Sequence, residues 1–170
     1  MVRVELTEQD ADFREWILRT ADEHGAAVIN VAADERGPQY SFTVGAWRRF
    51  SAPEAVVIGL PTEVAGSVLN SYVRRAAAGE RFHPGQLYPG LLDNCSMTVE
   101  KVCHDAYPMY FGSAFLLYPQ GNFPAIQLIM PIPDGPFPWQ PDAPEGFFEF
   151  QPLLTDSGYP ESWVPGRTGP

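Results

Sequence analysis

The fold is decided by the stretch Gln39–Pro61, which reads QYSFTVGAWRRFSAPEAVVIGLP. Its first part, Tyr40–Gly45, is rich in aromatic and β-branched residues and predicts a strand. Its last part, Glu54–Leu60, is a short continuous apolar run, which is typical of a strand covered on both faces. Between them, Ala46–Phe50 predicts an exposed corner with two arginines and two aromatic side chains. Neighbouring strands joined by so short a connection pair antiparallel, so they form the centre of the predicted sheet.

Helical and strand patterns alternate along the rest of the chain. Apolar residues at helical spacing predict a helix over Glu8–His24, and a second helix begins at Thr62 and is closed by Gly79. The other expected elements are a strand over Ala26–Val31, a loop over Glu80–Asn94, a strand over Cys95–Cys103, a third helix from Asp105 to Tyr118 and a last strand over Pro124–Met130. The predicted fold class is α+β, with a mainly antiparallel sheet of about five strands covered by three helices.

The end of the chain differs in composition from the rest. From Pro131 onward it holds ten of the eighteen prolines, together with several aromatic residues and no helical period. We therefore expect residues 1–141 to form a single α+β domain and residues 142–170 to form an extended Pro-rich C-terminal arm. The arm packs on the domain or on a second subunit, which makes a homodimer a further expectation.

Charge and composition exclude several classes of partner. The 170-residue chain has a formal net charge of −10, which repels nucleic acids and anionic membranes. No apolar run approaches the roughly 20 residues that span a bilayer, and the N-terminus lacks a signal-peptide core. We therefore expect no nucleic acid partner, no membrane partner and a cytoplasmic location.

Motifs for metals and cofactors are missing from the sequence. Cys95 and Cys103 show no spacing typical of a zinc site, and as cytosolic cysteines they are expected to be reduced. The glycines form no phosphate-binding loop, and no G-x-S-x-G nucleophile motif occurs. We expect neither a metal nor a cofactor.

Six sequence blocks follow one another between about Phe42 and Trp139: FTVGAWRRFSAPEAVVIGLP, VAGSVLN, AAGERFHPGQ, YPMYFG, FPAIQLIMP and DGPFPW. In this order they resemble a widespread bacterial domain of unknown function. Members of that family commonly have Gly-His before the proline of the second strand. This chain has Ser51-Ala52 there, so any role of that histidine is absent or moved. Small members can accompany natural-product pathways, so the resemblance implies an apolar metabolite as substrate.

The candidate acid–base group is His104, which follows a predicted strand and precedes a predicted helix. A histidine beside tyrosines can act as a general acid or base. In this interpretation His104 moves a proton, Tyr107 or Tyr110 donates to an oxygen, and Arg48 stabilises developing negative charge. The alternatives are that His104 binds backbone at the helix start and that Arg48 is a solvated surface charge.

The candidate substrate-binding residues are mostly aromatic: Tyr40, Trp47, Phe111, Gln127 and Trp139. Core packing is the alternative for most of the aromatic residues. Trp47 and Tyr110 are better suited to a pocket rim, because they lie near chain reversals or carry a polar end. Gln127 is either a buried amide bound to backbone or an oriented donor in a pocket.

These residues lead to one main functional hypothesis and two alternatives. The main hypothesis is a small cofactor-independent enzyme of lyase or cyclase type. It would use acid–base chemistry for dehydration or elimination, conjugate addition or cyclisation of an apolar metabolite. The alternatives are a non-catalytic module that binds a small ligand or a protein, and a scaffold assembled through the arm. The enzyme hypothesis requires that the His104 turn and the Trp47 corner meet across one apolar hollow.

Overall fold

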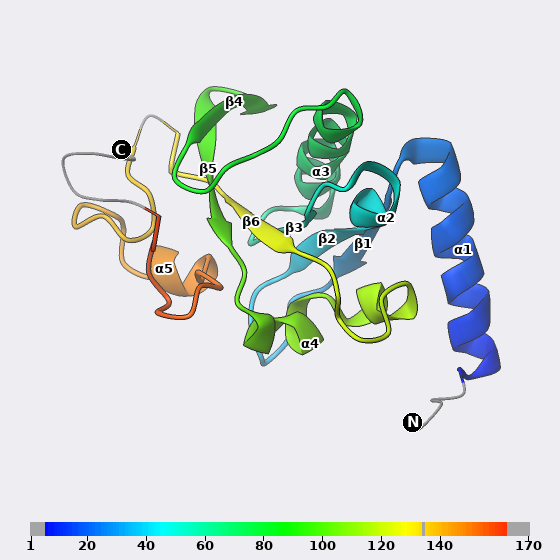
Figure 1. Ribbon diagram of the computed structural model, residues 1–170. Helices are drawn as coiled ribbons and strands as arrows, with labels where there is room; N and C mark the ends of the chain where they lie inside the picture. Colours follow the sequence, from blue (N-terminus) through cyan, green and yellow to red (C-terminus); the bar gives the residue numbers. More distant parts are fainter. Residues whose placement is uncertain (1–5, 134, 163–170) are drawn as a thin grey trace.

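The computed structural model describes residues 6–133 and 135–162, and its six strands form one sheet (Figure 1). The strands are β1 (Ala27–Val31), β2 (Tyr40–Val44), β3 (Glu54–Ile58), β4 (Leu87–Leu92), β5 (Cys95–Lys101) and β6 (Ala125–Ile129). Their order across the sheet is β1-β2-β3-β6-β5-β4, and every pairing is antiparallel except that of β3 with β6. The predicted α+β class is confirmed, with six strands in place of about five.

The helices are α1 (Glu8–His24), α2 (Ala46–Phe50), α3 (Thr62–Ala77), α4 (Tyr107–Tyr110) and α5 (Phe147–Phe150), with 3₁₀ segments η1 (His104–Ala106) and η2 (Gly112–Leu116). The two long helices begin and end close to the predicted residues. The Thr7 side chain accepts a hydrogen bond from the Asp10 amide at 3.1 Å, which satisfies a donor at the start of α1. Gly25 ends this helix with a φ of 94°, a conformation that favours glycine.

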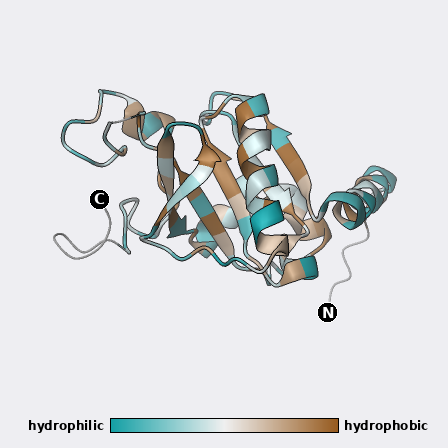
Figure 2. Ribbon diagram, turned by 90° about the horizontal axis from the view of Figure 1, so that it is seen from above, coloured by the Kyte–Doolittle hydropathy of each residue, from teal (hydrophilic) through white to brown (hydrophobic). Residues whose placement is uncertain are grey.

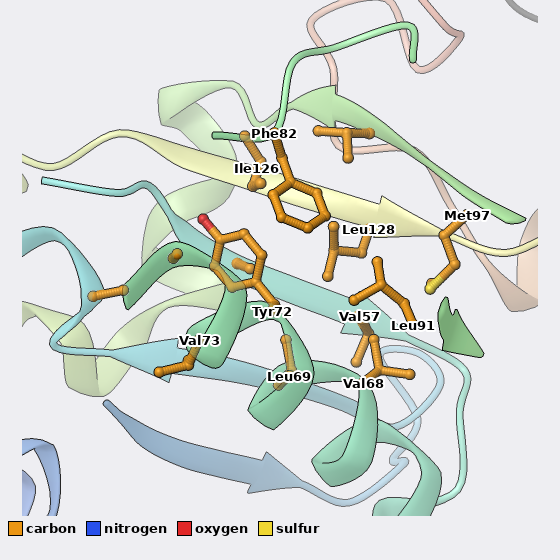
Figure 3. Close-up of a cluster of buried hydrophobic side chains, with 14 of the residues drawn as sticks. Val57, Val68, Leu69, Tyr72, Val73, Phe82, Leu91, Met97, Ile126 and Leu128 are labelled. Carbon is orange, nitrogen blue, oxygen red and sulfur yellow. The ribbon is translucent and has the colours of Figure 1, made fainter. Parts of the chain in front are cut away.

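Helix α3 covers one face of the sheet with a continuous apolar stripe (Figures 2 and 3). Its buried side chains include Leu69 and Tyr72, which pack against Val57 and Leu128 from the strands. The opposite face is covered by aromatic residues of the α4 and η2 segment and by Ile17 of α1. Every residue of β3 and β6 is buried, as expected for central strands between two covered faces.

Three segments differ from the sequence-based expectations. The predicted loop Glu80–Asn94 contains β4, which forms a hairpin with β5 and whose register shifts between Tyr88 and Leu92. The predicted third helix is divided into η1, α4 and η2, and Phe111 leaves the helical conformation between α4 and η2 with a φ of −131°. The Ala46–Phe50 corner is the short helix α2, and it is exposed only at its two arginines.

The described part of the arm is held on the sheet by buried polar side chains. Gln127 of β6 donates to the Pro152 carbonyl at 2.7 Å and accepts from the Leu154 amide at 2.9 Å. In the other direction, Gln151 of the arm binds both the amide and the carbonyl of Met130. Glu100 of β5 accepts hydrogen bonds from two consecutive amides of the arm, those of residues 161 and 162. Residues 163–170 of the predicted arm lie outside the described residues.

Replacement of Gln127 tests this attachment. Gln127→Ala leaves the Pro152 carbonyl and the Leu154 amide without their partner and opens a cavity. We therefore expect a loss of about 2–4 kcal/mol in free energy of unfolding, with faster limited proteolysis within residues 150–162. Gln86→Ala, at an exposed position, is the control. Unchanged proteolysis of the arm in Gln127→Ala would contradict the attachment.

Candidate functional site

The carboxylate of Glu54 is fully buried at the start of β3 and is surrounded by donors. It accepts hydrogen bonds from the hydroxyls of Thr43 and Tyr118 and from the amides of Gly45, Ala46 and Trp47, all at 2.6–3.1 Å. Burial raises the pKa of Glu54, and the hydrogen bonds oppose that shift. The carboxylate thereby ties β2 and α2 to the segment that follows η2. Sequence reasoning missed this role, although an acid opening a wholly apolar strand is a detectable signal.

The space between α2 and the His104 turn is filled with stacked rings. His104 stacks on Tyr107 at 4.5 Å between centroids, Tyr107 on Phe123 at 4.7 Å, and Phe123 lies 4.9 Å from Tyr118. The Tyr118 hydroxyl in turn accepts a hydrogen bond from the Arg48 amide at 3.1 Å. The expectation that the two loops meet across one hollow is therefore wrong, because a packed aromatic layer lies between them.

Tyr107 and Phe111 belong to this aromatic layer. Both side chains are buried, and the Tyr107 hydroxyl donates to the Phe123 carbonyl at 2.9 Å. Burial raises the pKa of Tyr107 to about 12. At neutral pH this hydroxyl is thus a neutral group already bonded to the backbone.

A hollow of about 400 Å³ opens at one end of the sheet, between the connection from β1 to β2 and helix α4. We call it the tyrosine hollow; its lining includes Asp34, Arg36, Gly37, Tyr40, Met109 and Tyr110. Two of the predicted site residues, Tyr40 and Tyr110, meet here, with ring centroids 4.9 Å apart and planes at 63°. Sequence reasoning missed the charged residues, although the polar turn directly before the Tyr40 strand places them at this sheet end.

The two tyrosine hydroxyls of the hollow differ in their bonding. The Tyr40 hydroxyl donates to the Met109 carbonyl at 2.8 Å, which joins β2 to α4. Tyr110 is only 8% exposed, and its hydroxyl makes no hydrogen bond with the described residues. Burial raises the pKa of both phenols, so both are neutral donors near neutral pH.

Charged groups lie at the entrance of the tyrosine hollow. Asp34 accepts a hydrogen bond from the Arg36 amide at 2.8 Å, which fixes the turn. The pKa of Tyr40 is raised mainly by burial, and further by the neighbouring Tyr110 and by the charge of Asp34. The charge of Arg36 lowers it. Both charges therefore act close to the Tyr40 hydroxyl. The Arg36 guanidinium is exposed and forms no salt bridge within the described part of the chain.

His104 lines a second, smaller hollow of about 160 Å³ between the end of β5 and the arm. Five of its six lining residues are ionisable, and we call it the ionisable hollow: Lys101, Val102, Cys103, His104, Asp156 and Glu161. The exposed imidazole ring of His104 thus lies near carboxylates and a thiol, but on the other side of Tyr107 from the Trp47 corner.

The remaining predicted site residues lie elsewhere. Trp47 is partly buried against the aromatic layer, and the Arg48 side chain is exposed. Gln127 engages the arm backbone, and Trp139 stacks on Phe137 at 5.1 Å. The predicted residues therefore do not form one site, and of them Tyr40, Tyr110 and His104 border hollows.

Fold and site together define an α+β domain with a mixed six-stranded sheet and a tyrosine-lined hollow at one end. The chain belongs to the family described as a domain of unknown function, DUF4262, whose model matches residues 20–144. This match confirms the resemblance read from the six sequence blocks. No curated protein and no solved structure matches the chain. Among residues 6–133 and 135–162, no helix is long and apolar enough to cross a membrane, and no cluster of side chains could hold a metal ion.

Glu54→Gln tests the role of the buried carboxylate. In glutamine an NH2 group replaces one carboxylate oxygen, and this group faces hydroxyl and backbone N–H groups that also donate. We therefore expect a loss of about 2–4 kcal/mol in free energy of unfolding. Glu63→Gln, at an exposed position early in α3, should change stability by less than about 0.5 kcal/mol. Equal stability of the two variants in urea unfolding would contradict the assignment.

Tyr107→Phe tests the aromatic layer through its pH dependence. At neutral pH, loss of the hydrogen bond to Phe123 should cost about 1 kcal/mol. The raised pKa means that the folded state holds the phenol proton more tightly than the unfolded chain. This stabilisation of the wild type is complete below pH 10.0 and is lost as the pH rises through about 12. The stability difference between wild type and variant should therefore narrow above pH 10.0, and a constant difference would contradict the account.

Proposed function

We propose that this protein binds a small, largely apolar molecule in the tyrosine hollow. The observation that supports this most strongly is Tyr110, which lines the hollow and whose hydroxyl makes no hydrogen bond with the described residues. A phenol hydroxyl in that position can donate a hydrogen bond to a molecule bound in the hollow. A bound molecule with an acceptor atom would supply the missing hydrogen bond.

The dimensions and rigidity of the hollow support the same proposal. Its volume of about 400 Å³ falls within the range of small-molecule sites. One wall is fixed by two backbone hydrogen bonds between Asp34 and Gly37, and the other by the bond from Tyr40 to Met109. A preformed site loses less conformational entropy on binding, which favours affinity for a small ligand.

A second candidate function is acid–base catalysis in the ionisable hollow, in which His104 would move a proton. The gathering of an imidazole, a thiol, an ammonium and two carboxylates around one hollow favours it. Mass spectrometry of candidate ligands after incubation with the protein separates the two functions. Unchanged ligand supports binding alone, whereas a product that disappears in His104→Ala supports catalysis.

Gly37→Phe tests the proposed binding site by filling it. Gly37 lines the hollow, a Cβ atom there meets nothing within 4 Å, and its φ lies outside the left-handed region, so a larger side chain is compatible with the fold. We expect stability within about 1 kcal/mol of wild type and loss of binding for small aromatic fragments that raise the melting temperature of the wild type.

Gly66→Phe is the matched control, because its added Cβ on α3 also meets open space but lies away from the hollow. Fragments should raise the melting temperature of this variant as they do for the wild type. If the fragments stabilise Gly37→Phe equally well, the tyrosine hollow is not the binding site.

A further inference from the structure

We propose that the ligand of the tyrosine hollow is an aromatic carboxylate, whose anionic group is bound by Arg36 and Tyr110. This inference rests on the proposed function and adds the chemical class of the ligand. It follows from the polar groups that the hollow leaves available, from the shape of its apolar walls and from the two charges at its entrance.

The available side-chain donors favour an anionic acceptor. The Tyr110 hydroxyl has no partner among the described residues, and the Arg36 guanidinium has no salt bridge there. A guanidinium presents a planar set of N–H groups that matches the two oxygens of a carboxylate. The Tyr40 hydroxyl already donates to Met109, so it has only acceptor capacity left. A carboxylate can accept from both Arg36 and Tyr110, which an amine cannot do.

The apolar lining favours a flat ring system. The rings of Tyr40 and Tyr110 meet edge to face at 63°, and each can offer a face or an edge to a third ring. Met109 lines the same hollow, and its thioether group makes favourable contacts with aromatic rings. A mono- or bicyclic aromatic body fits this combination better than a flexible chain, because it loses less conformational entropy on binding.

Asp34 is the opposing charge, and it makes the proposal sharply testable. Its carboxylate also lines the hollow and repels an anion, although one oxygen accepts from the Arg36 amide. The rest of the net charge of −10 is largely screened beyond about 8 Å at physiological salt. Removal of the Arg36 charge should therefore weaken the binding of an anion, and removal of the Asp34 charge should strengthen it.

The test compares 2-naphthoate with 2-naphthamide, which share one ring system and differ in charge. Dissociation constants are measured by NMR titration of the full chain at low ionic strength. We expect wild type to bind the naphthoate more tightly than the naphthamide. Arg36→Gln should weaken naphthoate binding by about threefold to tenfold, and Asp34→Asn, which keeps the acceptor for the Arg36 amide, should strengthen it by a similar factor. Tyr110→Phe should weaken it as well.

Naphthamide binding should be nearly unaffected by the two charge changes. Arg19→Gln, at an exposed position on α1, is the control for a general change in net charge and should leave both probes unaffected. If both probes bind wild type equally, or if the charge variants do not differ, the carboxylate assignment is overturned while the binding function stands. If neither probe shifts the signals of Tyr40 and Tyr110, the carboxylate assignment also fails, and the fragment screen against Gly37→Phe then decides the binding function separately.

Discussion

The carboxylate of Glu54 is the contact on which the centre of this fold depends. It lies where β3 begins, and it accepts hydrogen bonds from β2, from the first amides of α2 and from Tyr118, which is 64 residues away in the sequence. Removal of a carboxylate from water costs several kcal/mol, and only a complete set of donors offsets that cost. One side chain therefore fixes the β2–β3 connection and holds the aromatic layer against it.

The same use of buried polar groups attaches the arm to the sheet. Gln127 and Gln151 each bind one donor and one acceptor of the opposing backbone, as a neighbouring strand would do. Tyr110 differs from these glutamines, because it lines the tyrosine hollow and its hydroxyl donates to no described residue. This hydroxyl, together with a hollow of suitable size, supports the proposed binding site at Tyr110 and not in the aromatic layer.

The sequence predicted the parts of the fold that depend on local pattern. The apolar stripe of α3 and the two strands around Ala46–Phe50 occur where periodicity and composition indicate them. Strand β4 was missed because Pro89 and Gly90 are typical of loops. The parallel pairing of β3 with β6 was missed because it depends on contacts between distant segments, which no local pattern records. For the proposed site, the sequence singled out Tyr40 and Tyr110 by their chemistry, whereas Arg36 was not considered because a charged turn resembles any solvated loop.

Amide hydrogen exchange of Trp47 and Leu154 tests the central claim that buried side chains hold the connections of this fold. Both amides donate to side-chain oxygens, those of Glu54 and Gln127, and neither belongs to a strand ladder. The account predicts that both exchange about as slowly as the amide of Val56 in the core of β3. Exchange as fast as in an unstructured chain, while Val56 remains protected, would contradict it.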